Sequence, residues 1–121
     1  MASSPIIIQI LDKPEHDGIV AQSKDMPTVI YVSNSVLPAC KAFGPKFHAL
    51  VEQWSPRGIR FCQLEFTDKT SMMFKFAPNQ LPVTVFMVHD NWCKTVMGAD
   101  AAAMEIALGE LLEQDKKAVQ S

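Results

Sequence analysis

Three cysteines carry most of the reactive chemistry that this sequence offers: Cys40, Cys62 and Cys93. A cysteine attacks other groups as its thiolate, and the N-terminus of a helix stabilises that form. Cys40 lies at the start of a segment whose apolar residues recur at helical spacing. The odd number of cysteines and their unpaired spacing argue against a secreted disulfide framework. We therefore expect a reducing compartment and a cytoplasmic protein.

No other catalytic motif is found in the sequence. His16, His48 and His89 are scattered and have no metal-ligand spacing to one another or to the cysteines. The sequence contains no glycine-rich phosphate loop, no G-x-S-x-G elbow and no paired-carboxylate motif. We therefore expect neither a metal ion nor a cofactor.

The composition is typical of one globular domain, which we expect to span residues 1–121. Hydrophobic residues make up 48% of the chain and charged residues 20%, and the net charge is -2. Because no block of Lys and Arg occurs, neither nucleic acid nor an anionic membrane is an expected partner. The first residues lack a positively charged region and Gln9 interrupts their apolar run, so we predict neither a signal peptide nor a membrane-spanning helix.

Strand and helix patterns alternate along the chain, and these elements must position the cysteines. A β-branched run is typical of a buried strand, and apolar residues at helical spacing predict an amphipathic helix. Asp100 can cap the N-terminus of the last helix. The predicted strands are Ile6 to Leu11, Thr28 to Ser33, Ile59 to Phe66, Val83 to Val88 and Cys93 to Met97; the predicted helices are Lys13 to Ser23, Ala39 to Trp54, Ser71 to Phe76 and a last one with the buried stripe Met104, Ala107, Leu108, Leu111 and Leu112.

The element order is β-α-β-α-β-α-β-β-α, which predicts an α/β fold. Strands that alternate with helices pair in parallel through crossover connections, whereas the final hairpin adds an antiparallel edge. The expected architecture is a mixed central sheet with helices on both faces.

Three segments resemble the thioredoxin family, in the family's order and at its intervals. Residues 40–47 are similar to the segment that begins at the second redox cysteine, with Pro45 at the place of a helix-kinking proline. Residues 75–83 are similar to the segment around the family's cis-proline, which would be Pro82. Gly98-Ala99 is similar to the Gly-Ala pair after the last strand. The resemblance covers nearly the whole chain and implies a thioredoxin fold.

The redox motif itself departs from the family pattern. The family has Trp-Cys-Gly-Pro-Cys where this chain has Val36-Leu37-Pro38-Ala39-Cys40, so Leu37 replaces the attacking cysteine. Tyr31 stands at the place of a buried aspartate that assists proton transfer, and Val83 at the place of a threonine. Disulfide reduction needs an attacking thiolate and a second thiol that releases the mixed disulfide. The chain is therefore not expected to be a conventional dithiol-disulfide oxidoreductase.

The environments of the cysteines are also predictable. We expect Cys62 to be buried within its strand and Cys93 to be a partly exposed strand residue. Cys40 has two interpretations: a monothiol that forms a mixed disulfide or a sulfenic acid, or a semi-buried residue that packs beneath Leu37. Residues 72–76, rich in Met and Phe, are either helix core or an adaptable binding surface.

A thioredoxin fold without its thiol chemistry retains a groove for an extended peptide or protein segment. Apolar walls favour holding such a segment over reacting with it. We therefore hypothesise a non-catalytic, protein-binding or regulatory module. The expected walls of the groove are Val36, Leu37, Pro38, Ala39, Leu81, Pro82, Val83, Gly98 and Ala99.

Two alternatives stay open at this point. The first is a monothiol redox protein that acts through Cys40 in cell redox homeostasis. The second is a co-factor of chaperonins or G-protein subunits, because residues 36–40, 60–62 and 80–82 also resemble the thioredoxin-like domain of phosducin-like proteins. Those proteins likewise lack the first cysteine.

Overall fold

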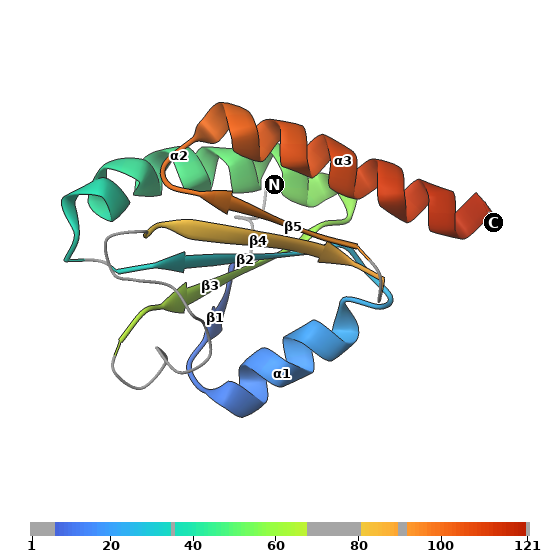
Figure 1. Cartoon of the computed structure of the whole chain (residues 1–121), viewed down its shortest axis with the longest axis horizontal. Coiled ribbons are helices and arrows are strands. Elements are labelled where there is room, and N and C mark those ends of the chain that lie inside the picture. Colours follow the sequence, from blue (N-terminus) through green and yellow to red (C-terminus); the bar gives the residue numbers. More distant parts are fainter. Residues whose placement is uncertain (1–6, 35, 68–80, 90–91, 121) are drawn as a thin grey trace, which may run out of the picture.

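Five strands form one sheet in the order β1-β3-β2-β4-β5 (Figure 1). The computed structural model describes residues 7–34, 36–67, 81–89 and 92–120. The strands are β1 (Ile7–Ile10), β2 (Thr28–Ser33), β3 (Arg60–Glu65), β4 (Val83–Val88) and β5 (Trp92–Met97), and the helices are α1 (Lys13–Gln22), α2 (Pro38–Trp54) and α3 (Ala101–Gln120).

The sheet is mixed, as predicted. β1, β3 and β2 run parallel to one another, whereas β4 is antiparallel to both β2 and β5. The register places Val83 beside Val32 on one side and Met97 on the other. The predicted helix over residues 71–76, and residues 90–91 of the turn predicted at His89-Asp90-Asn91, lie outside the described residues.

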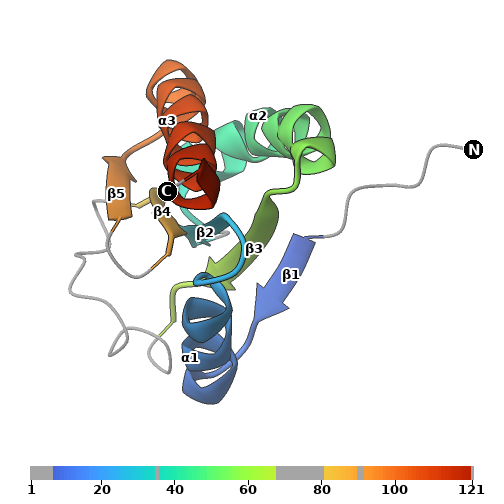
Figure 2. The ribbon, with the colours of Figure 1, turned by 90° about the vertical axis from the view of Figure 1, so that its right-hand side faces the viewer.

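Helices cover both faces of the sheet, which confirms the predicted layers. α2 and α3 lie on one face and α1 on the other (Figure 2). All six residues of β2 are buried, because this central strand is covered on both faces. The α2–α3 side has the larger core, in which the ring of Phe47 stacks on that of Tyr31 with 4.0 Å between centroids. The opposite face holds a smaller cluster that includes Cys62 and Leu64.

Local sequence signals explain where the helices begin and end. Pro38 opens α2, a position at which its missing N–H is not needed, and Pro45 lies within the helix. A short 3-10 turn, Ser55–Arg57, follows α2 and ends at Gly58, whose φ of 89° favours glycine. The predicted cap of α3 is confirmed, since Asp100 Oδ1 accepts a hydrogen bond of 3.0 Å from the N–H of Ala103.

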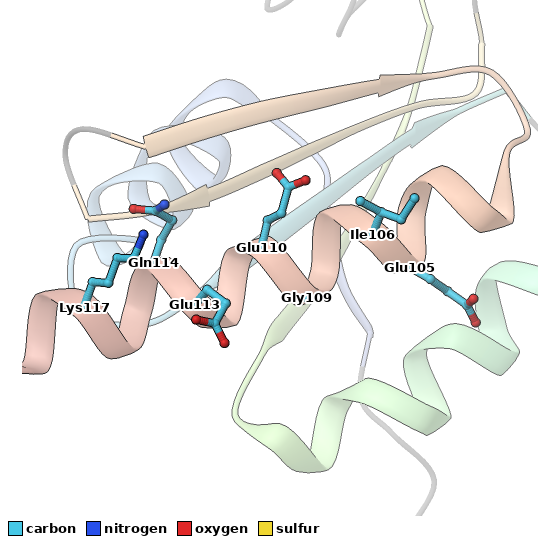
Figure 3. A pocket seen from close by; sticks show the side chains of 7 residues that line it. All are labelled: Glu105, Ile106, Gly109, Glu110, Glu113, Gln114 and Lys117. Carbon is cyan, nitrogen blue, oxygen red and sulfur yellow. The ribbon is translucent and has the colours of Figure 1, made fainter.

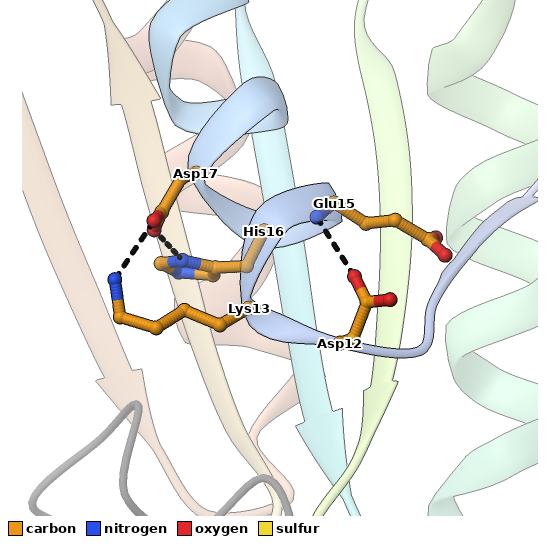
Figure 4. A network of polar contacts seen from close by, with 5 residues as sticks. All are labelled: Asp12, Lys13, Glu15, His16 and Asp17. Atoms are coloured by element: carbon orange, nitrogen blue, oxygen red, sulfur yellow. Dashed lines mark hydrogen bonds and ion pairs between the residues drawn. The ribbon is translucent and has the colours of Figure 1, made fainter.

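α1 has no fully buried residue; Ile19 packs against the smaller core cluster, and a set of polar contacts lies in the first turns of the helix (Figure 4). Asp12 caps the helix by accepting a 2.9 Å hydrogen bond from the N–H of Glu15. Asp17 contacts Lys13 Nζ at 2.8 Å and His16 Nδ1 at 3.1 Å. The hydrogen bond from Lys13, followed by that from His16, lowers the pKa of the Asp17 carboxyl. These exposed contacts fix the helix only weakly.

Candidate functional site

Three segments that the sequence analysis singled out meet at one end of the sheet. β2 ends at Ser33, β4 begins at Val83 and β5 ends at Met97, all at the same edge because β4 runs against its two neighbours. The N–H of Gly98 donates a hydrogen bond of 2.8 Å to the carbonyl oxygen of Pro82. The loop before α2, the Pro82 segment and the Gly98 turn therefore form one continuous site.

Asn34 holds the loop between β2 and α2 in place. Its Oδ1 accepts a 3.0 Å hydrogen bond from the N–H of Val36, and its main-chain oxygen accepts one of 3.0 Å from the N–H of Leu37. Its Nδ2 donates to the carbonyl oxygen of Phe66 at 3.3 Å. The sequence analysis missed this residue, although an asparagine directly after a strand is a recognised turn signal.

Leu37 occupies the N-cap of α2, the position that the resemblance assigns to the attacking cysteine. It makes no side-chain capping bond, and its half-buried side chain packs against the smaller core cluster. That cluster also holds Cys40, Leu81 and Val83. Leucine at this point adds apolar contact and offers no group that could attack a disulfide.

Cys40 lies within the first turn of α2 and is only 5% exposed. Its Sγ accepts a 3.4 Å hydrogen bond from the N–H of Asn34. A polar contact of this kind suits either a thiol or an oxidised sulfur, but a reagent in solvent has little access to the atom. The surroundings agree with the interpretation of Cys40 as a residue packed near Leu37.

Tyr31, at the position where the resemblance implies a proton-transfer group, is an aromatic core residue. Its side chain is 1% exposed, and Oη has no hydrogen-bond partner among the described residues. Burial, and secondarily the nearby charge of Cys40, raises the pKa of the Tyr31 hydroxyl. A phenol with a raised pKa stays protonated at neutral pH and cannot serve as a base for a neighbouring thiol.

The two remaining cysteines lie where they were predicted. Cys62 is fully buried in β3, and burial raises the pKa of its thiol to about 11. Cys93 is exposed on β5, and all three thiols are free. Within the described part of the chain, no three His, Cys, Asp or Glu side chains are grouped so that they could hold a metal ion.

The predicted groove residues divide into buried and exposed sets. Leu81, Pro82 and Val83 are all buried, so their side chains are not available to a bound segment. The Leu81–Pro82 peptide bond is cis, the isomer that the resemblance implies. The exposed apolar residues form a surface that we call the apolar rim, and it consists of Val36, Pro38, Ala39, Met97 and Ala99.

The apolar rim contains the two large side chains that solvent reaches most easily at this site. Val36 is 72% exposed and Met97 46%. The sequence analysis did not include Met97, although its place as the last residue of β5, directly before Gly98, could have indicated it. The rim consists of apolar side chains, so its chemistry favours apolar contact.

Comparisons with known proteins agree with this architecture. No family model matches the chain, and no curated protein matches it in sequence. Thioredoxin f from spinach chloroplast superposes with a TM-score of 0.75 at 18% identity, over 89% of this chain and 88% of that one. Malassezia sympodialis thioredoxin also gives 0.75, at 17% identity over 91% and 94% of the two chains. Trypanosoma brucei brucei thioredoxin gives 0.75 at 16% identity, over 93% and 96%.

At these identities the likeness establishes the fold. None of the described helices combines the length and hydrophobicity needed to cross a membrane. The strand order, the helices on both faces and the structural neighbours all agree, and the chain has the thioredoxin fold.

Proposed function

We propose that this chain is a non-catalytic protein-binding module, which holds an extended segment of a partner protein against the apolar rim. The observation that carries the proposal is the exposure of Val36 and Met97 at the site where a thioredoxin presents its reactive thiol. Exposed apolar side chains that gather at one site favour association with another surface. This site has no thiol at the position that the resemblance assigns to the attacking cysteine, because Leu37 occupies it.

Main-chain groups beside the rim offer a second kind of contact. Within the described residues, the main chain of Leu81 makes no hydrogen bond, whereas the carbonyl oxygen of Pro82 accepts one from the N–H of Gly98. An extended segment can pair with free main-chain groups and place alternate side chains on an apolar surface. This arrangement suits a partner segment with a hydrophobic side chain opposite Val36 or Met97.

The proposal is tested by comparing what variants of the full chain capture. Val36→Asp introduces a charge into the rim and should weaken capture at least tenfold, equivalent to about 1.4 kcal/mol. Leu11→Asp is the matched control, because Leu11 is 73% exposed and follows β1, which lies two strands away from β2 in the sheet. Cys40→Ser should capture the same proteins as the unmodified chain. Equal capture by Val36→Asp and Leu11→Asp would contradict the proposal, and recovery of chaperonin subunits would identify the phosducin-like class of partner.

Catalysis is tested separately, by the reduction of insulin disulfides with dithiothreitol. We expect the chain to add nothing to the rate with dithiothreitol alone. Leu37→Cys restores two thiols three residues apart and serves as the positive control. Acceleration by the unmodified chain would show that one thiol suffices and would overturn the non-catalytic proposal.

A monothiol role for Cys40 is the second candidate, and the hydrogen bond from the N–H of Asn34 to its sulfur favours it. Such a donor would also hold the oxygen-bearing sulfur of a sulfenic acid. The 5% exposure of Cys40 argues against it, because an oxidant or a partner thiol must reach the sulfur. Mixed-disulfide formation with glutathione at Cys40 in the folded protein would favour this candidate over the first.

A further inference from the structure

β5 forms one edge of the sheet. Among the described strands it pairs only with β4, through a register that is unbroken from Trp92 to Met97. Natural proteins protect such edges with proline, bulges, charges or very short strands. β5 has six residues without proline or glycine, and its one charged side chain, Lys94, is held against α3 by Glu110 at 3.0 Å. The edge is therefore open to pairing with another strand.

The hydrogen-bond pattern shows which main-chain groups of β5 face outward. The N–H of Gly98 donates to the carbonyl oxygen of Pro82, and the register of β4 and β5 places these two residues opposite each other. Bonded pairs alternate with non-bonded pairs along an antiparallel ladder, so every second residue of β5, counted back from Gly98, bonds to β4. The residues between them direct their N–H and C=O groups away from the sheet. These outward residues are Cys93, Thr95 and Met97.

The side chains of the same three residues are exposed and uncharged. They lie on the face of the sheet opposite α3, because successive side chains of a strand alternate and Val96 is buried in the α2–α3 core. We call Cys93, Thr95 and Met97 the β5 edge. It offers outward main-chain groups and uncharged side chains together, which suits the addition of a strand.

We propose that the β5 edge binds the β5 edge of a second copy of this chain, as an antiparallel pair that joins the two sheets into one. A two-fold axis at Thr95 places the two Thr95 residues opposite each other, and each Cys93 opposite Met97 of the other copy. In this register all the outward N–H and C=O groups bond across the interface. An axis at Lys94 would place two lysines opposite each other, which disfavours that register.

The flank of α3 favours a second copy over a single peptide strand. Ile106 is 61% exposed and lies one turn before Glu110, whose carboxylate contacts Lys94 of β5. Figure 3 shows Ile106 and Glu110 on the same side of α3, toward the β4–β5 hairpin. A two-fold axis perpendicular to the sheet brings both α3 helices to the same face, with these flanks toward each other. A peptide strand brings no helix and would leave Ile106 exposed.

Sedimentation equilibrium and hydrogen exchange of the full chain, in a reducing buffer, test this proposal. An edge-strand contact is smaller than a standard interface, so we expect a monomer–dimer equilibrium over about 10 to 500 µM. In the dimer the amide hydrogens of Thr95 and Met97 should exchange about tenfold more slowly than in the monomer. Those of Lys94 and Val96 should change little, because they already bond to β4.

Charges at the two-fold position test the register. Thr95→Lys and Thr95→Glu each place like charges opposite each other and should raise the dimer dissociation constant about tenfold. An equimolar mixture of these two variants should regain the dimer, because the facing charges are then opposite. Gln9→Lys is the matched control, since it adds the same charge to an exposed residue of the other edge strand, β1, and should not change the association. Val36→Asp should not change it either, so this test is separate from that of the apolar rim.

Three results would overturn the proposal. The first is a chain that stays monomeric at millimolar concentration. The second is a dimer in which Thr95 and Met97 exchange as fast as they do in the monomer, which would place the interface elsewhere. The third is equal association of Thr95→Lys and Gln9→Lys, or a mixture of Thr95→Lys and Thr95→Glu that stays as weak as either variant alone.

Discussion

Replacement of Tyr31 by phenylalanine should stabilise the protein. The ring of Tyr31 stacks on that of Phe47 with 4.0 Å between centroids and 14° between planes, and Oη is buried without a partner among the described residues. A buried hydroxyl that lacks a hydrogen bond costs about 1–3 kcal/mol. Tyr31→Phe keeps the ring and removes that atom, so the free energy of unfolding should rise by about 1–2 kcal/mol.

Urea unfolding followed by circular dichroism measures this change. With an m-value of about 1–3 kcal/mol/M, the midpoint should rise by roughly 0.5–1 M while the m-value stays the same. Phe47→Leu is the control in the opposite direction, because it removes the stacking partner and should cost about 1–2 kcal/mol. If Tyr31→Phe lowers the stability at an unchanged m-value, the hydroxyl makes a stabilising contact and the reasoning is refuted.

The same substitution has a consequence at high pH. Because burial raises the pKa of Tyr31 above its usual 10.0, the folded protein holds this proton more tightly than the unfolded chain does. The contribution of Tyr31 to stability is complete below pH 10 and is lost as the pH rises further. Tyr31→Phe should therefore lose less stability than the unmodified chain above pH 10, as measured by urea unfolding at each pH.

Three further changes can be predicted from the structure. Burial raises the pKa of Cys62 from 9.0 to about 11, so the free energy of unfolding should fall by about 2 kcal/mol between pH 9 and 11. Cys62→Ala should lose this pH dependence, although it is less stable than the unmodified chain at pH 9. In the folded protein, iodoacetamide should label the exposed Cys93 well before the buried Cys40 and Cys62. In urea all three cysteines should be labelled at similar rates. Rapid labelling of Cys40 in the folded protein would contradict its burial. Asp100→Ala should lower the free energy of unfolding by about 1 kcal/mol, as measured by thermal unfolding, because the cap of α3 is lost. Asp100→Asn should keep most of the stability of the unmodified chain. If Asp100→Ala loses no stability, another group caps α3.

Local signals predicted most of the fold correctly. Thr28–Ser33 and Val83–Val88 form strands with the predicted bounds, because β-branched runs in a covered sheet leave little choice. Asp100 caps α3 as predicted, since the capping bond spans only three residues. The burial of Cys62 followed from its place within a strand covered on both faces.

Features that depend on distant residues were less predictable. Asn34 bonds to Phe66, 32 residues away, and no local pattern specifies that contact. The resemblance predicted that Leu81 lies in a groove wall, but it did not predict that its side chain is buried. Met97 gains its importance from the register that pairs it with Val83, which is a property of the assembled sheet.

The position of β1 at the edge of the sheet, with α1 following it across one face, has a consequence for how the native protein opens. Among the described strands, β1 pairs only with β3, and α1 buries no side chain fully. Two hydrogen bonds tie the end of α1 to the rest of the sheet: the N–H of His89 donates to the carbonyl oxygen of Ser23, and the Arg60 guanidinium donates to the side chain of Gln22. Separation of this βα unit would leave β3, β2, β4 and β5 adjacent and still hydrogen-bonded in order. Amide hydrogens of α1 should therefore exchange with solvent through a partial opening, at a lower free energy than those of β2, whose exchange requires the whole domain to unfold.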